Sequence, residues 1–197
     1  MEPKPIILAM YSGGLDSLGM IYKLLTESEY KDYFIHIHHV HNHNVENRDR
    51  AEAIVVEKVL KELERLGFDF IYSESRISSQ PYGMKFLYDS DTINFFAGYI
   101  CSANPNIVKV AMGMQANDGN HALEERRKRA DQILAAFTDV KKIYPVLTMS
   151  KREIYDSLPE SLRNMFWSCR RPVYTEKSIA PCLKCDTCVK LREQSIR

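Results

Sequence analysis

The stretch from Ile6 to Ser17, I-I-L-A-M-Y-S-G-G-L-D-S, decides the fold because an apolar run ends abruptly at two glycines. A short, continuous apolar run such as 6–10 is typical of a strand buried on both faces, as in a parallel sheet. The segment 18–25 is again rich in apolar residues, and we expect it to form the first helix. A buried strand, a tight turn and a helix therefore follow one another at the start of the chain.

The turn between them has the composition of a phosphate site. Gly13 and Gly14 let the backbone turn tightly and approach an anion without a Cβ in the way, while the next helix directs its first amides and positive end toward that anion. Ser12 and Ser17 add hydroxyl donors, and Asp16 suits Mg²⁺ that bridges phosphate oxygens. A plain polar surface turn is the alternative, and the buried strand before the glycines argues against it.

The rest of the chain alternates between strand-like and helix-like segments. We expect strands at 33–40, 68–72, 108–112 and 141–145, and helices at 51–66, 92–102, 123–137 and after Ser150, where Ser150 and Glu153 have capping-box spacing. Such alternation predicts an α/β fold with a Rossmann-like, doubly wound parallel sheet covered by helices on both faces.

Length and charge favour a single enzyme-sized domain with a small-molecule substrate. The chain has 197 residues, which suffice for one covered sheet and a small appendage. Its 27 Lys and Arg against 26 Asp and Glu give a net charge of +1, so a nucleic acid is not expected as the direct substrate. We find neither a signal-like start nor an apolar run of membrane-spanning length, and expect a soluble, cytoplasmic protein.

Four cysteines near the end of the chain predict a metal site. Cys169, Cys182, Cys185 and Cys188 have the spacing C-x12-C-x2-C-x2-C. Four thiolates can close a tetrahedral Zn²⁺ site and leave no position open for water, so we expect a structural role. An iron–sulfur cluster on the same ligands remains an alternative. We therefore divide the chain into a catalytic domain at 1–160 and a zinc-binding segment at 161–197.

The sequence S-G-G-x-D-S after a first strand resembles the signature of the PP-loop, or N-type, ATP pyrophosphatases, whose fold is adenine nucleotide alpha hydrolase-like. The resemblance implies that the turn holds the pyrophosphate end of ATP while a substrate oxygen attacks the α-phosphate. It assigns ATP contacts to Tyr11, Ser12, Gly13, Gly14, Leu15, Asp16 and Ser17, with Ser12, Asp16 and Ser17 also catalytic. The lysine of a Walker A motif is absent.

A PP-loop combined with a cysteine tail is similar to the 7-cyano-7-deazaguanine synthases. The segment 113–118, with Glu124 and Arg126 after it, resembles that family's G-V-N-x-x-D region, and 47–52 resembles its Q-R-H-x-x-E. The stretch from Pro145 to Glu153 resembles P-L-x-x-x-K-x-E, whereas 122–126 departs from the family's Y-P-D-C-R. The resemblance implies an ATP contact at Gly113, a catalytic Lys151, and substrate contacts at Asp118, Glu124, Arg126 and Arg48.

The implied reaction joins 7-carboxy-7-deazaguanine to ammonia, with two ATP consumed, and yields an amide and then a nitrile. A variant that stops at the amide and a tRNA-modifying thiolase are the nearest alternatives, although Cys101, the one cysteine outside the cluster, lies in an apolar helix and is expected in the core. A nucleic-acid-binding module, using Arg163, Arg170, Arg171 and Lys184, is a further alternative. The sequence is also compatible with a homodimer.

The histidine-rich run 36–43 allows two interpretations. Alternate histidines on a strand share a face, as metal ligands would, but carboxylate ligands and helical H-x3-H spacing are missing. We therefore expect a polar strand end that lines the nucleotide cleft.

Overall fold

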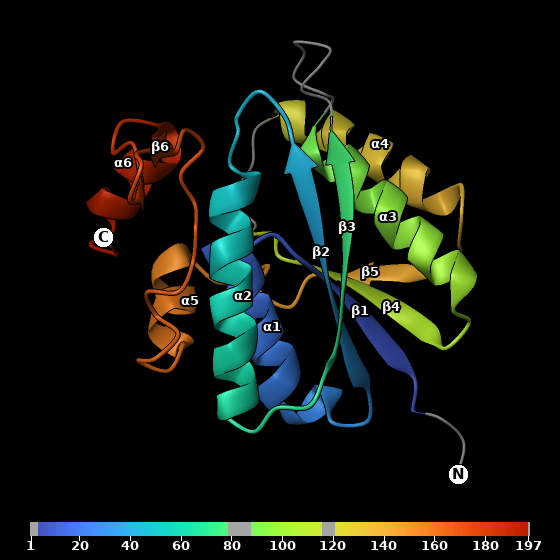
Figure 1. Ribbon diagram of the computed structural model, residues 1–197. Coiled ribbons are helices and arrows are strands. Elements are labelled where there is room, and N and C mark those ends of the chain that lie inside the picture. Colours follow the sequence, from blue (N-terminus) through green and yellow to red (C-terminus); the bar gives the residue numbers. More distant parts are fainter. Residues whose placement is uncertain (1–3, 79–87, 116–120, 197) are drawn as a thin grey trace.

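A five-stranded parallel sheet forms the centre of the molecule (Figure 1). The computed structural model describes residues 4–78, 88–115 and 121–196. The strands are β1 (Ile6–Tyr11), β2 (Phe34–His43), β3 (Ile71–Ser78), β4 (Ile107–Met112) and β5 (Lys141–Ile143), in the order β3-β2-β1-β4-β5. All four pairings are parallel. The predicted doubly wound α/β fold is confirmed.

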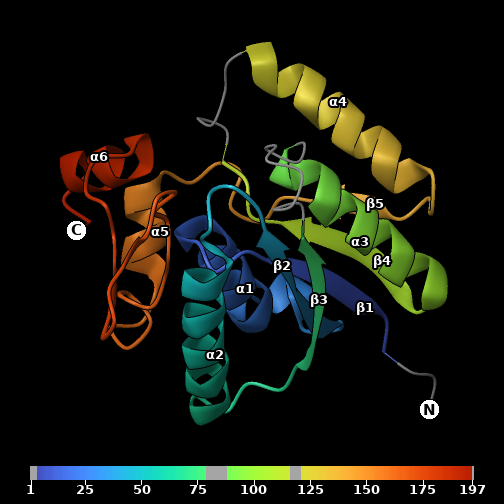
Figure 2. The same ribbon diagram turned by 45° about the horizontal axis from the view of Figure 1, so that its top comes forward.

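Helices cover both faces of this sheet (Figures 1 and 2). The helices α1 (Leu15–Thr26) and α2 (Asp49–Arg65) pack on one face, and α3 (Asp89–Ala103) and α4 (His121–Ala135) lie on the other. A short 3-10 helix, η1 (Ser28–Tyr30), precedes β2. The final part of the chain contains α5 (Lys151–Ser157), the two-stranded β6 (Val173–Tyr174) and β7 (Ile179–Ala180), and α6 (Asp186–Glu193). It lies beside α1 and α2.

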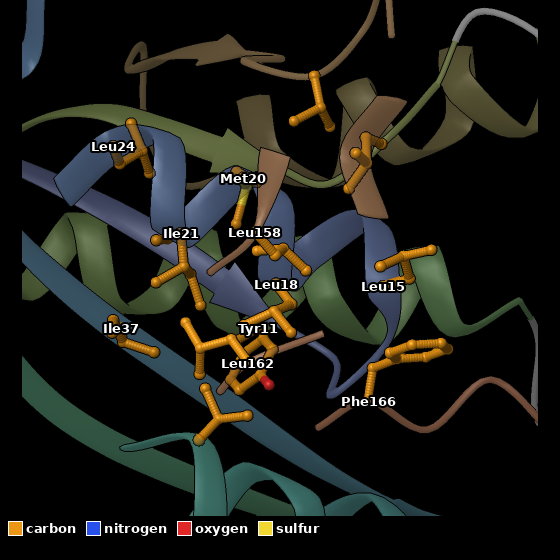
Figure 3. Packing of buried hydrophobic residues seen from close by; sticks show 14 of the residues in the cluster. Tyr11, Leu15, Leu18, Met20, Ile21, Leu24, Ile37, Leu158, Leu162 and Phe166 are labelled. Atoms are coloured by element: carbon orange, nitrogen blue, oxygen red, sulfur yellow. The ribbon is translucent and has the colours of Figure 1, made fainter. Parts of the chain in front are cut away.

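Strand β1 belongs to both hydrophobic cores. All six of its residues are buried. Because side chains alternate across a strand, Ile7, Ala9 and Tyr11 face α1 and α2, whereas Ile6, Leu8 and Met10 face α3 and α4. Figure 3 shows Tyr11 among the packed apolar side chains of α1 and the segment after α5. The continuous apolar run at the start of the sequence thus follows from burial on both faces.

Strand β3 begins at Ile71, three residues later than the sequence suggested. The reason is the end of α2, where Gly67 has φ +85°. The Gly67 amide donates to the carbonyl of Glu64 at 2.9 Å, and the Phe68 amide donates to that of Leu63 at 3.1 Å. This is the paired bonding of a Schellman motif, and it uses Phe68 as part of the helix cap. Gly67 thus closes the helix that the sequence predicts at 51–66.

Strand β2 continues to His43, beyond the predicted end at Val40. Polar residues are retained in it because β3 pairs with it along its whole second half, up to His43 opposite Ser78. Successive side chains of this half face opposite sides of the sheet. The histidine-rich run therefore lies on two faces and does not form one cluster.

Helix α5 begins after Ser150, as the sequence predicts, and packs closely against α1. Ser150 accepts a hydrogen bond from the Glu153 amide, and Glu153 accepts one from the Ser150 amide. In the middle of α1, a Cβ added to Gly19 would lie 2.3 Å from Cγ2 of Ile154. The two helices approach so closely only because residue 19 has no side chain. Among the described residues, no helix has the length and apolar character needed to cross a membrane.

This contact yields the first prediction. Replacement Gly19→Ala raises helix propensity by up to about 1 kcal/mol, but the overlap with Ile154 should reverse the sign and lower the free energy of unfolding by about 1–3 kcal/mol. Leucine carries no Cγ2, so the double variant Gly19→Ala/Ile154→Leu should recover most of this loss relative to Ile154→Leu alone. Urea denaturation of the four proteins measures it. A double variant as unstable as the sum of the two single changes would contradict the contact.

Candidate nucleotide and metal sites

The loop between β1 and α1 is a compact, internally bonded turn. Gly13 has φ +80°, a conformation that a residue with a side chain rarely adopts. The hydroxyls of Ser12 and Ser17 lie 2.9 Å apart, and the Ser17 hydroxyl donates to the carbonyl of Gly14 at 3.0 Å. Gly14 caps α1 without a side-chain hydrogen bond to the helix amides. The first turn of α1 therefore presents backbone amides next to two hydroxyls, as an anion site requires.

The end of β4 lies directly against this loop. A Cβ on Gly113 would be 2.5 Å from Cα of Ser17 and 2.6 Å from its nitrogen. Only glycine permits this approach of two backbone segments. Between β1 and β4 the strand order reverses, and open α/β sheets bind ligands outside the carboxyl ends of strands at such a point. Gly113 thus holds the loop at the place where the fold favours a ligand site.

Lys151, predicted to be catalytic, reaches the loop from α5. Its ammonium group lies 2.6 Å from Oδ2 of Asp16, with the two side chains 17% and 18% exposed. The pair joins residues that are 135 positions apart in the sequence. The structure therefore places a cation and a carboxylate together at the first turn of α1.

A cavity of about 760 Å³ opens next to the loop. It is bounded by Ser12 and Ser17, by the end of β4 at Gly113, and by α3, α4, β5 and the final segment. Its charged lining consists of Arg126, Arg127, Lys142, Arg170 and Lys190 against Asp131 and Asp186. Lys142 and Asp131 pair at 2.5 Å. The remaining excess of cations suits a ligand with phosphate or carboxylate groups.

The predicted substrate residues differ in their placement. Arg126 lines the cavity, and its guanidinium carbon lies 3.9 Å from the centre of the Tyr88 ring. Glu124 is exposed and lies in a shallow depression on the outer side of α4, so its position gives no support to a substrate contact. Asp118 lies outside the described residues. Of the two predicted residues on α4, Arg126 therefore faces the cavity and Glu124 faces solvent.

Arg48 forms part of a buried ionic network. It contacts Glu46 at 3.0 Å, Glu52 at 2.8 Å, and Asp89. Burial raises the pKa of Glu52 to about 7, and the nearby Arg48 opposes this rise. With three carboxylates around its guanidinium, Arg48 organises the loop between β2 and α2. A direct contact with substrate stays a prediction.

Two residues of the predicted ATP-binding loop have buried side chains. Tyr11 and Leu15 are each 2% exposed and belong to the core on the side of α1 and α2 (Figure 3). Tyr11 also uses its carbonyl, which lies 2.8 Å from Nδ1 of His39. Their side chains anchor both ends of the loop in the core, so a ligand contact at these two positions is left to their backbone atoms.

The four predicted metal ligands converge. The sulfurs of Cys169, Cys182, Cys185 and Cys188 all lie within 4.8 Å of one another. Among the described residues they form the one group of three or more cysteine, histidine or acidic side chains with this geometry, so the histidine-rich run of β2 does not. The cysteine cluster could bind a metal.

Backbone amides support the thiolate form of these cysteines. The Cys182 sulfur accepts from the amides of Lys184 at 3.5 Å and Cys185 at 3.3 Å. The amide of Lys184 has the largest effect and helps to lower the pKa of Cys182 to about 6. Burial has the opposite effect on Cys188 and raises its pKa to about 12. One thiol of the cluster thus ionises readily, as binding of a cation requires.

The cysteine segment is tied directly to the glycine loop. The backbone amide of Trp167 donates to the carbonyl of Gly13 at 2.8 Å. The Trp167 ring packs with Cys169 and with Ala51 of α2. From the same segment, Arg170 reaches Glu46 at 3.0 Å and lines the cavity. The two predicted parts of the chain therefore meet at the glycine loop.

Local sequence patterns missed several residues of the cavity wall. Lys142 comes from β5, where no motif surrounds it, and Asp186 and Lys190 come from α6, within or just after the last C-x2-C step, which pointed to the cysteines alone. Arg170 stood out only as part of a basic cluster for nucleic acid. Their common signal is position, because each lies on an element that the fold brings to the carboxyl edge of the sheet.

Comparisons with known proteins establish the fold. No family model matches the sequence, and no curated protein matches it. Among solved structures, the chain is similar to the U34-tRNA thiolase NcsA from Methanococcus maripaludis, solved with its [4Fe-4S] cluster. The TM-score is 0.56 at 18% sequence identity, and the match covers 98% of this chain and 65% of that one. The chain thus shares the parallel α/β fold of this thiolase over nearly its whole length.

Proposed function

We propose that this chain is a PP-loop enzyme that uses ATP to activate an oxygen atom of its substrate. The observation that carries the proposal is the glycine loop at the head of α1, which opens into a cation-rich cavity at the switch point of the sheet. The fold likeness to a tRNA thiolase is consistent with it. The loop would bind the pyrophosphate end of ATP, and Asp16 would provide a carboxylate for Mg²⁺, which neutralises phosphate charge.

The chemistry follows from the placement of charge. A substrate oxygen forms a bond to the α-phosphorus as the bond from that phosphorus to the pyrophosphate oxygen breaks. Negative charge grows on the departing pyrophosphate, next to the amides of the first turn of α1 and the ammonium group of Lys151. Fixed donors at this point stabilise the transition state more than the ground state. The products of the step are the substrate adenylate and pyrophosphate.

For the substrate, we propose 7-carboxy-7-deazaguanine with ammonia. Its carboxylate is a poor electrophile until adenylation makes the oxygen a leaving group. Ammonia adds to the carbonyl carbon, AMP departs and a proton is released, which gives the amide. Adenylation of the amide oxygen by a second ATP, followed by loss of AMP and two protons, gives the nitrile. The cation-rich cavity suits both the carboxylate and the phosphates.

Transfer of sulfur to tRNA is the second candidate, favoured by the fold likeness to the thiolase. The thiol outside the cysteine cluster argues against it. Cys101 is 5% exposed within α3, and burial raises its pKa to about 11, so it is a poor nucleophile. Any sulfur chemistry would have to use the cluster cysteines themselves. We therefore place the small substrate first.

The reaction is tested by mass spectrometry of the protein with Mg-ATP, an ammonium salt and 7-carboxy-7-deazaguanine. We expect the amide or nitrile together with AMP and pyrophosphate. The double variant Ser12→Ala/Asp16→Ala should lose at least about 10²-fold in rate, as expected for removal of transition-state donors. The matched control Ser28→Ala/Asp32→Ala changes exposed residues before β2, at the opposite edge of the sheet, and should retain full activity.

Absence of product, with sulfur instead incorporated into tRNA, would replace the proposed substrate and keep ATP activation. Absence of ATP turnover with every acceptor would refute the enzyme proposal itself.

A second test isolates Lys151. Lys151→Met should lower kcat by about 10²-fold or more while the protein keeps its melting temperature within a few degrees, because the ammonium group serves the developing charge. Lys61→Met is a close control, since Lys61 forms a pair with Glu57 at the same 2.6 Å but on the surface of α2. Steady-state pyrophosphate release measures both. Equal rates in the two variants would show that the Lys151–Asp16 pair is structural only.

For the cysteine cluster we propose Zn²⁺. Zinc–sulfur bonds of about 2.3 Å in a tetrahedron separate the sulfurs by roughly 3.8 Å, which agrees with four sulfurs inside one 4.8 Å group. A cubane cluster attaches each thiolate to a different iron and needs a wider arrangement. A four-cysteine zinc site holds no water and acts structurally, here by ordering the segment that contacts Gly13.

We expect one zinc per chain by elemental analysis and no visible absorbance. Cys185→Ser should lose the metal and weaken ATP binding through the contact between Trp167 and Gly13, whereas Cys101→Ser should keep both. Iron with visible absorbance in protein purified without oxygen would overturn the zinc assignment.

A further inference from the structure

A second, smaller chamber lies behind the glycine loop. It has a volume of about 210 Å³ and shares Met10, Ser12 and Ile93 with the large cavity. It sits at the carboxyl ends of β1 and β2, under the loop that leads to α2. A ligand anchored by phosphate at Ser12, or one that reacts with such a ligand, could therefore extend into it. Apart from residues of the loop itself, the residues that line this chamber have no part in the proposed phosphate binding.

Two buried residues in the wall of this chamber carry polar atoms without a hydrogen-bond partner. His38 and Asn42 line it and are 2% and 9% exposed. Among the described residues, neither Nε2 of His38 nor Oδ1 of Asn42 has a hydrogen-bond partner. A buried polar atom without a partner destabilises the fold, so such atoms in residues that line a cavity point to a ligand that satisfies them.

Both side chains are held in place by neighbours. The Asn42 amide group donates to Oδ1 of Asp89 at 3.1 Å, which orients its oxygen as an acceptor. Nδ1 of His38 lies 2.7 Å from the hydroxyl of Ser73, and the same hydroxyl lies 2.6 Å from Nε2 of His36. A single hydroxyl proton can serve only one of these two nitrogens. The exchange of that proton decides whether Nε2 of His38 donates or accepts.

The chamber combines apolar walls with a charged part in which carboxyl groups are in excess. Met10, Val40 and Ile93 provide apolar surface. Among its charged lining residues, the two carboxyl groups of Glu52 and Asp89 outnumber the one guanidinium group of Arg48. This balance disfavours a phosphate in the chamber and favours a neutral group that carries N–H donors.

The neighbours of His38 keep it neutral. Burial lowers its pKa to about 4, and His36, His39 and His41 act in the same direction, while Glu74 opposes them. On the other side it faces Phe96 of α3. A neutral imidazole has one donor and one acceptor nitrogen, so it can recognise an uncharged heterocycle by hydrogen bonding.

We propose that this chamber binds a planar heterocyclic base by its hydrogen-bonding edge, with His38 and Asn42 as the residues that read it. The volume fits one fused ring system between the apolar walls. Two ligands of the proposed reaction carry such a base, namely ATP and the deazaguanine substrate. The choice of these ligands rests on the proposed function, whereas the description of the chamber does not. Ser73 and His36 act as positioning residues that set the tautomer of His38.

The test is calorimetric titration of the full chain with ATP, inorganic triphosphate and 7-carboxy-7-deazaguanine. Replacements His38→Leu and Asn42→Leu should each weaken binding of one base-bearing ligand by about tenfold, as expected for loss of a buried hydrogen bond. Affinity for triphosphate should stay unchanged, because triphosphate binds through the loop alone. The ligand whose affinity falls identifies the base that occupies the chamber.

The matched controls are His41→Leu, on the opposite face of β2, and Asn106→Leu, an exposed residue before β4. Neither should change any of the three affinities. Ser73→Ala leaves His38 and Asn42 in place and provides a readout that a structural defect would not give. The Ser73→Ala change should alter the ratio of the affinities for adenosine and inosine, or the ratio of the affinities for the deazaguanine and its deaminated analogue. The two members of each pair differ in the donors and acceptors on the edge of the base.

Unchanged affinity for both base-bearing ligands in folded His38→Leu and Asn42→Leu variants would overturn the chamber assignment. Wild-type protein that binds neither base-bearing ligand better than triphosphate would overturn it too. Failure of triphosphate to bind, with the base-bearing ligand still sensitive to His38→Leu, would instead refute the phosphate-loop proposal and support the chamber.

Discussion

Complete burial of β1 is the constraint on which the rest of the structure depends. Its two faces belong to different cores, so the strand cannot move without disturbing both layers of helices. The loop that follows it therefore starts from a fixed point. Gly113 then holds the first turn of α1 against the end of β4 by a backbone contact that no larger residue permits. The candidate anion site, which must present amides with little freedom, thus lies next to the most constrained strand of the sheet.

The cysteine segment acts on the same loop from outside the sheet. The hydrogen bond from Trp167 to Gly13 connects it to the glycine loop, and the ion pair from Arg170 to Glu46 connects it to the ionic network around Arg48. In a segment with only two-residue strands and one short helix, a metal can supply order that a small apolar core cannot. The metal proposed for the cysteines would thus contribute to nucleotide binding through position, without touching the nucleotide.

The polar residues around the loop separate into two chemical environments. The large cavity has an excess of cations and suits phosphates, whereas the chamber behind Ser12 combines apolar walls, neutral hydrogen-bonding groups and an acidic rim. Neighbouring compartments of opposite preference allow one ligand to be oriented end to end, or two ligands to meet near the loop. Orientation of this kind is a large part of what an adenylating enzyme contributes to rate.

The sequence by itself determined the sheet, the glycine loop and the cysteine cluster, because each depends on local spacing: an apolar run of strand length, paired glycines before a helix, and C-x2-C steps. Only the tertiary structure placed Lys151 at Asp16, enclosed Arg48 among three carboxylates, put Glu124 on the outside of α4, and brought Lys190 and Arg170 to the cavity wall. Local periodicity fixes which face of an element is buried, but the partner across a cavity is set by packing of distant segments. Likewise, His38 and Asn42 were visible only as polar residues in a strand, since an unsatisfied nitrogen or oxygen is a property of three-dimensional neighbours.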